Sequence, residues 1–231
     1  MKFGFKKDSP VEVGVYTLGD HMPNPHTDER IPAKQRIKEI IQLAAAAEAA
    51  GLDFFGVGES HQDYFATQAH TVILGAIAQE TDKIKIGSSS TIISTLDPVR
   101  VYEDFATIDA ISDERVEIVA GRASRVGVFD LMGYDRQDYH DLYDEKLELF
   151  QLINKNERVT WEGKFRASLT DASVLPRAER EIPLWRAVGG APASAIAAGR
   201  DNIPMMMAYL AGPIEPFETT VKHYYQSAET A

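Results

Sequence analysis

Short apolar runs alternate with longer amphipathic stretches along most of the chain. The short runs have the length and branched composition of buried strands, whereas the longer stretches carry apolar residues at helical spacing. The predicted strands cover residues 11–16, 53–57, 84–88, 116–120, 184–188 and 203–207. The predicted helices cover residues 33–50, 67–81, 98–111, 138–153, 191–199 and 217–228. This order predicts a parallel sheet with right-handed crossovers.

Polar residues follow the predicted strands, which helps to choose between an open sheet and a barrel. Glu59 and His61 come after the second strand, residues 88–90 are three serines after the third, and Arg122 comes after the fourth. Chemistry at the carboxyl ends of successive strands is typical of a barrel mouth. No Gly-x-Gly-x-x-Gly pattern follows the first strand, which argues against an open dinucleotide-binding sheet. We therefore expect a TIM-barrel-type α/β fold.

One region interrupts the alternation of strands and helices. We interpret residues 123–182 as an insertion after the fourth strand, within a single domain that covers residues 1–231. Residues 158–166 alternate around Gly163 and predict a small hairpin. Such an insertion is expected to lie over or beside the mouth of a barrel.

Composition narrows the classes of function. The chain has 231 residues, of which 44% are hydrophobic, and a formal net charge of -11, which disfavours nucleic-acid binding. It has no cysteine, so disulfides and thiolate chemistry are excluded. It contains neither an apolar run of membrane-spanning length nor a signal-peptide pattern, so we expect a cytoplasmic protein without a membrane partner. The histidines His21, His26 and His70 do not form a ligand pattern, and we predict no metal.

Six short segments together resemble the luciferase-like monooxygenase family. They occur in the family's order and at its spacing across nearly the whole chain. They are Gly-Glu-Ser-His at 58–61, residues 87–95 with Asp-Pro-Val-Arg at 97–100, residues 104–109, Ala-Gly-Arg-Ala-Ser at 120–124, residues 131–135 and Ala-Val-Gly-Gly-Ala-Pro at 187–192. The resemblance implies an eight-unit (β/α) barrel that binds FMN at its carboxyl-terminal face. In such an enzyme, reduced FMN and molecular oxygen oxidise a small organic substrate.

The resemblance also assigns roles to residues of the phosphate end. Arg122 matches the family's phosphate-contacting arginine, although without the resemblance a surface ion pair is the better interpretation. Gly189 and Gly190 precede a helix, so their amides could hold the same phosphate, or they could form a simple turn. Ser194 could add a hydroxyl group.

The remaining site residues are expected near the flavin ring. Ser88, Ser89 and Ser90 are expected under the ring, in a stretch that can contain a non-proline cis peptide in this family. Glu59, which matches an acid that faces the flavin, and His61 are the catalytic candidates, although a lone loop histidine is more often structural than catalytic. Ser60 stands where the family often has a histidine tied to catalysis, and serine cannot act as a base near neutral pH.

The resemblance predicts two further strand–helix units that this chain does not contain. We therefore expect an incomplete barrel that is part of a longer natural chain, is covered by another chain, as in a homo-oligomer (dimer or tetramer), or belongs to a shortened relative. Three functions remain open: an FMN-dependent monooxygenase supplied by a separate flavin reductase, an F420-dependent hydride-transfer enzyme, or a truncated flavin-binding barrel without turnover.

Overall fold

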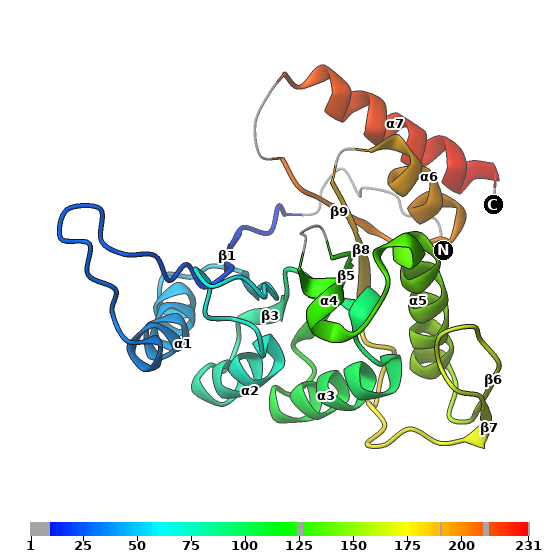
Figure 1. Cartoon of the computed structure of the whole chain (residues 1–231), viewed down its shortest axis with the longest axis horizontal. Coiled ribbons are helices and arrows are strands. Elements are labelled where there is room, and N and C mark those ends of the chain that lie inside the picture. The colour runs from blue at the N-terminus through cyan, green and yellow to red at the C-terminus, as the bar shows by residue number, and fades with distance from the viewer. Residues whose placement is uncertain (1–9, 124–126, 190, 210–212, 231) are drawn as a thin grey trace.

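A parallel sheet forms the centre of the fold, with helices along its outer face (Figure 1). The computed structural model describes residues 10–123, 127–189, 191–209 and 213–230. Neighbouring strands of the sheet are all parallel. The order is β1 (Gly14–Thr17), β2 (Phe54–Val57), β3 (Lys85–Ser88), β5 (Val116–Gly121), β8 (Leu184–Val188) and β9 (Met205–Met207), with the short β4 (Thr91–Ile92) beside β5. The sheet is a parallel half-barrel of the expected α/β class.

Helices connect most of the strands and pack against one another along the outside. They are α1 (Ala33–Ala49), α2 (His70–Glu80), α3 (Pro98–Ile111), α4 (Val128–Met132), α5 (Tyr139–Lys155), α6 (Pro192–Arg200) and α7 (Glu215–Thr230). Local sequence explains where the helices begin and end. The Asp97 carboxylate accepts a hydrogen bond from the Val99 amide at the start of α3, and Pro98 occupies the first turn. Gly51, with φ at +77°, follows α1 in a left-handed conformation that glycine adopts without strain.

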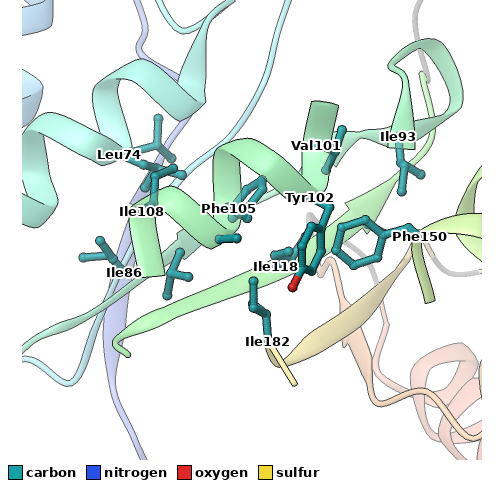
Figure 2. Packing of buried hydrophobic residues seen from close by; sticks show 14 of the residues in the cluster. Leu74, Ile86, Ile93, Val101, Tyr102, Phe105, Ile108, Ile118, Phe150 and Ile182 are labelled. Atoms are coloured by element: carbon teal, nitrogen blue, oxygen red, sulfur yellow. The ribbon is translucent and has the colours of Figure 1, made fainter. Parts of the chain in front are cut away.

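The main hydrophobic core lies between the sheet and helices α2, α3 and α5 (Figure 2). Leu74, Ile86, Phe105, Ile118 and Phe150 are fully buried there. Burial of a side chain of this size contributes roughly 1.5–3 kcal/mol each, so this core is the main source of stability for β3 and β5.

The two edge strands differ from the centre. Within the described part of the chain, β1 pairs only with β2, and β9 only with β8. Near β1, Val11, Val13 and Tyr16 are 82%, 57% and 59% exposed. The apolar side chains at this edge therefore lack the packing that the central strands have.

All six predicted strands have counterparts in the sheet, but several boundaries were wrong. The first strand begins at Gly14 rather than residue 11, and α2 begins at His70 rather than residue 67. The earlier start of α2 fails because the Thr67 hydroxyl donates to the Leu18 carbonyl oxygen, 2.6 Å away, in a loop.

A hairpin forms in this region as predicted, but its predicted bounds, residues 158–166, were wrong. The strand β6 (Val159–Trp161) pairs antiparallel with β7 (Leu169–Ala172), so Gly163 lies in the connection. The Glu145 carboxylate accepts hydrogen bonds from the amides of Lys164, Phe165 and Arg166, and amides occupied in this way cannot pair as a strand.

Candidate functional site

A cavity of about 390 Å³ opens where β2, β3 and β5 end. Its polar wall contains Glu59, Ser60, His61, Ser89, Ser90 and Arg122, which come from the loops after these three strands. Leu18, Ile92, Val128 and Leu131 form an apolar part of the wall. Five of the nine predicted site residues therefore line one cavity at the carboxyl ends of parallel strands, where α/β barrels carry their chemistry.

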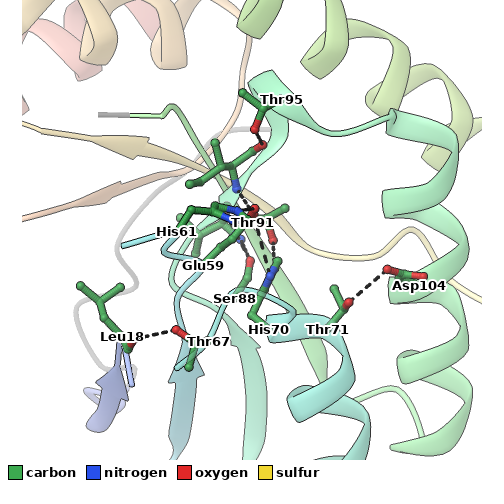
Figure 3. Close-up of polar contacts among 12 residues, drawn as sticks. Leu18, Glu59, His61, Thr67, His70, Thr71, Ser88, Thr91, Thr95 and Asp104 are labelled. Carbon is green, nitrogen blue, oxygen red and sulfur yellow. Dashed lines mark hydrogen bonds and ion pairs between the residues drawn. The ribbon is translucent and has the colours of Figure 1, made fainter. Parts of the chain in front are cut away.

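Glu59 is the buried centre of a polar cluster at one end of this cavity (Figure 3). Its Oε1 lies 2.6 Å from Nε2 of His61, and its Oε2 accepts a hydrogen bond of 2.7 Å from the Ile92 amide. Both carboxylate oxygens are thus occupied. The geometry makes Glu59 a group that orients His61, whose ring forms part of the cavity wall.

His70 completes the cluster from behind, and the sequence did not single it out. Its Nδ1 lies 3.8 Å from Oε2 of Glu59, and its Nε2 is 2.8 Å from the Thr91 hydroxyl. Burial lowers the pKa of His70 to about 4, while the charge of Glu59 opposes this shift. His70 is therefore neutral near pH 7. The place of His70 in the sequence, at the first position of α2 and nine residues after His61, did not indicate that it would face the Glu59 carboxylate.

The three serines of residues 88–90 have different positions. Ser88 is fully buried in β3, where its hydroxyl exchanges hydrogen bonds with the backbone of Val119, so it does not line the cavity. Ser89 and Ser90 do line it, and the peptide bond between them is cis, as the resemblance led us to expect. A Cβ added at Gly58 would collide with the Ser89 carbonyl oxygen, and one at Gly121 would collide with the Ser90 side chain. The two glycines therefore let this segment pack closely against the ends of β2 and β5.

Arg122 marks the other end of the cavity, directly after β5. Its guanidinium donates a hydrogen bond to the Ser194 hydroxyl and lies 3.2 Å from Nδ1 of His140. It also lies over the rings of Tyr139 and Tyr143, at 5.6 and 5.0 Å from their centroids. The bond to Ser194 links β5 with the first turn of α6, so two distant predicted residues meet. No role was predicted from the sequence for Tyr139, His140 and Tyr143, which lie in the region interpreted as an insertion.

The glycine pair is only partly visible. Gly189 is exposed at the end of β8, and Gly190 lies outside the described residues. Ser194 is buried in α6 and points toward Arg122 through the hydrogen bond already described.

Among the described residues, no three His, Asp or Glu side chains are grouped so that they could hold a metal ion. No helix in the described ranges is long and apolar enough to cross a membrane.

This combination of fold and cavity agrees with a comparison of the chain with known protein families. The profile of the luciferase-like monooxygenases matches residues 11–231. The chain belongs to this family. Relatives that the chain matches are named both as a dehydrogenase and as a monooxygenase, so membership of the family does not by itself choose a cofactor.

Two curated relatives illustrate this range. An N-acetyl-S-alkylcysteine monooxygenase of Bacillus subtilis (strain 168) is 28% identical, with 77% of this chain and 52% of the relative covered. An F420-dependent glucose-6-phosphate dehydrogenase of Amycolatopsis mediterranei (strain U-32) is 25% identical, with 71% and 51% covered. The chain therefore spans about half the length of the curated relatives it matches.

Solved structures of luciferase-like enzymes share the fold. The oxygenating constituent of 3,6-diketocamphane monooxygenase from the CAM plasmid of Pseudomonas putida, solved with FMN, superimposes with a TM-score of 0.80 at 17% identity. The match covers 95% of this chain and 63% of that one. At this identity the likeness shows the fold alone, and it agrees with a half-barrel that corresponds to part of a longer barrel.

Proposed function

We propose that this luciferase-like chain is an FMN-dependent oxidoreductase, a monooxygenase that uses reduced FMN and molecular oxygen on a small organic substrate. The observation that carries the proposal is the cavity at the ends of β2, β3 and β5, which has an arginine at one end and a carboxylate–imidazole pair at the other. The relative solved with FMN and the relative named a monooxygenase support it.

The arginine end suits the phosphate group of FMN. The Arg122 guanidinium and the Ser194 hydroxyl lie within hydrogen-bond reach of each other and could share one anionic group. A planar guanidinium binds two phosphate oxygens at once, and the start of α6 adds a favourable helix dipole. The amide of Gly189, which is exposed beside α6, could contribute a further donor. These residues fit a phosphate monoester better than an uncharged group.

The middle of the cavity suits a flat ring system. Ser89 and Ser90 present small side chains and backbone there, and Leu18, Ile92 and Val128 provide apolar surface. Reduced FMN, when bound, would supply the electrons for the reaction with oxygen. The apolar side chains would limit the access of water, which strengthens polar interactions inside the site.

The carboxylate end suits proton transfer at the substrate. Glu59 keeps the His61 ring in one orientation through the 2.6 Å contact between Oε1 and Nε2. In that orientation, a proton can be exchanged only at Nδ1 of His61, since Nε2 is engaged. His61 is therefore our candidate catalytic residue, and Glu59 its positioning residue.

A second cofactor deserves a direct test, because several relatives are named F420-dependent. F420 would transfer hydride without oxygen. Titration of the purified protein with FMN, riboflavin and F420, followed by absorbance and fluorescence, separates the two. Tighter binding of FMN than of the other two, with faster oxidation of the reduced flavin by oxygen, supports the proposal.

Other outcomes of the same experiment contradict it. Preference for F420 would point to a dehydrogenase, and FMN binding without any change in oxidation rate would point to a binding protein without turnover. Faster consumption of oxygen after addition of a flavin reductase would support the separate source of reduced FMN that we propose.

A further inference from the structure

One face of α5 surrounds the guanidinium of Arg122. Tyr139 and Tyr143 are four residues apart, so they share a helix face, and His140 adjoins them. The two phenol rings lie 5.6 and 5.0 Å from the Arg122 Cζ, and Nδ1 of His140 lies 3.2 Å from Nη1. Together with Ser194, four side chains thus contact the Arg122 guanidinium. The guanidinium of an ordinary surface arginine would be free in water.

We propose that Tyr143 and His140 are positioning residues that fix the Arg122 guanidinium for an anionic ligand. The start of α5 is then part of the cofactor site rather than of an insertion beside it. The inference rests on the proposed function, because it takes Arg122 to be the residue that contacts the phosphate of FMN. Neither side chain needs to touch the ligand for this role.

Tyr143 is held so that it can act as a fixed support. Its ring is 1% exposed, and its hydroxyl donates a 3.1 Å hydrogen bond to the carbonyl oxygen of Ala120, two residues before Arg122. Burial raises the pKa of Tyr143 to about 12, so the hydroxyl remains protonated and can donate. β5, which ends one residue before Arg122, therefore also anchors the ring on which the Arg122 guanidinium rests.

A second arginine lies over the same ring, and its charge is balanced. The Arg186 guanidinium is 4.9 Å from the Tyr143 centroid and contacts Asp144 and Asp201 at 3.4 and 3.2 Å. Arg122 has no carboxylate partner among the described residues. Of these two arginines on one ring, Arg122 is the one whose charge is left for a ligand.

The contact of His140 with Arg122 determines which nitrogen of the His140 ring carries the proton. A guanidinium has only donors, so Nδ1 of His140 must accept, and the proton of the neutral ring must lie on Nε2. An arginine side chain loses much rotational freedom when it binds an anion. Contacts that fix it beforehand reduce that loss and raise the affinity for the phosphate.

The test compares the affinities of FMN and riboflavin, which differ in the phosphate group. We expect Tyr143→Leu to weaken FMN binding at least fivefold (about 1 kcal/mol) and to change riboflavin binding less than twofold. Tyr102→Leu is the matched control, because Tyr102 is also fully buried with an arginine, Arg177, 4.8 Å from its ring, outside the cavity wall. Tyr102→Leu should leave the ratio of the FMN affinity to the riboflavin affinity unchanged. Tyr143→Phe should restore most of the ratio that Tyr143→Leu loses.

Two further variants keep the inference falsifiable if Tyr143→Leu does not fold. His140→Ala changes an exposed residue and should weaken FMN binding about two- to threefold without affecting riboflavin. In an Arg122→Ala background, both substitutions should have no further effect on FMN, since they act through Arg122. If they weaken FMN and riboflavin equally, or still act without Arg122, the positioning role is wrong. If the parent protein itself does not distinguish FMN from riboflavin, the proposed phosphate site fails first.

Discussion

The central strands β2, β3 and β5, here called the closed side, are built differently from the edge strands β1 and β9, here called the open side. Each of the two regions contributes to the same cavity. β2, β3 and β5 lie between neighbouring strands and under α2 and α3, and their residues Phe55, Ile86 and Ile118 are fully buried in the core between the sheet and the helices. At the edges, three of the four residues of β1 are exposed and all three of β9 are half-buried. The Glu59 cluster stands entirely on the closed side. Arg122, by contrast, depends on Ser194 of α6, which packs with the open side through α7 and β9.

The difference suggests that the two ends of the cavity respond differently to perturbation. The carboxylate end is fixed by buried contacts that do not involve the edge strands. The arginine end is fixed by one hydrogen bond across the sheet and by the aromatic face of α5. Conditions that loosen the open side should therefore affect phosphate binding before they affect the Glu59–His61 pair.

The largest expected effect is association through the open side. Each apolar side chain of medium size that becomes buried contributes about 1.5–3 kcal/mol, so covering Val13, Val15 and Tyr16 would add a large share of a typical domain stability of about 5–15 kcal/mol. We expect the protein to form dimers or tetramers at micromolar concentration, as measured by light scattering. A monomer with a high melting temperature that does not depend on concentration would show that the edges need no cover.

The next largest effect is on the free energy of unfolding, and the prediction compares one aromatic residue from each side. Phe105→Ala removes a fully buried ring of α3 and should lower the free energy of unfolding by about 3–5 kcal/mol. Tyr16→Ala removes a ring that is 59% exposed and should cost less than about 1 kcal/mol in dilute solution. Chemical denaturation of both variants measures the contrast. Equal losses would mean that β1 is packed as firmly as the centre.

A smaller effect is expected from His70 on the closed side. Its pKa is lowered from 6.5 to about 4 in the folded protein, so the unfolded state binds the proton more readily. The contribution of neutral His70 to the free energy of unfolding is then fully present above pH 6.5. It is lost as the pH drops toward 4, by at most about 3 kcal/mol. His70→Asn keeps a donor near Glu59 without titrating and should remove this part of the pH dependence. Unfolding measurements at several pH values would contradict the assignment if the parent and the variant lost stability in parallel.

The fold was largely predictable because periodicity reports burial. The strands at 53–57, 84–88 and 184–188 are short apolar runs, and their counterparts lie within the sheet. Boundaries failed where a side chain competes with the regular backbone, as Thr67 does before α2 and Glu145 does for the residues after Gly163. Such contacts join positions far apart in the sequence, and no local pattern encodes them.

The candidate site was predictable where residues follow strands directly. Glu59, Ser89 and Arg122 line one cavity because the carboxyl ends of parallel strands meet at one end of the sheet. His70 and Tyr143 were missed because they lie on helices, and only the packing of α2 and α5 brings them to the cavity residues. Ser88 faces the backbone of β5 instead, because successive residues of a strand point to opposite faces.

Arg122→Ala tests the end of the cavity that depends on the open side. We expect at least about tenfold weaker FMN binding, which corresponds to about 1.4 kcal/mol, with little change in melting temperature. The fold should survive because the contacts of the guanidinium with described residues are to side chains, those of Ser194, His140, Tyr139 and Tyr143. Fluorescence titration with FMN and riboflavin measures the effect. Unchanged FMN affinity would mean that Arg122 is an ordinary surface residue.

The smallest expected effect is at Ser60, on the closed side beside Glu59. Ser60 is buried and lines the cavity, at a position where the family often has a histidine. A serine hydroxyl is not a base near neutral pH, so Ser60→Ala should leave the rate of flavin oxidation within a few-fold of the parent. His61→Asn is the matched comparison, because it removes the imidazole that Glu59 orients. Loss of a general base typically costs on the order of 10² to 10⁴ in rate, and we expect substrate oxidation by His61→Asn to fall in that range. Stopped-flow oxidation and product formation would separate the two variants. A large loss in Ser60→Ala with a small one in His61→Asn would reverse the roles that the geometry assigns to these neighbouring residues.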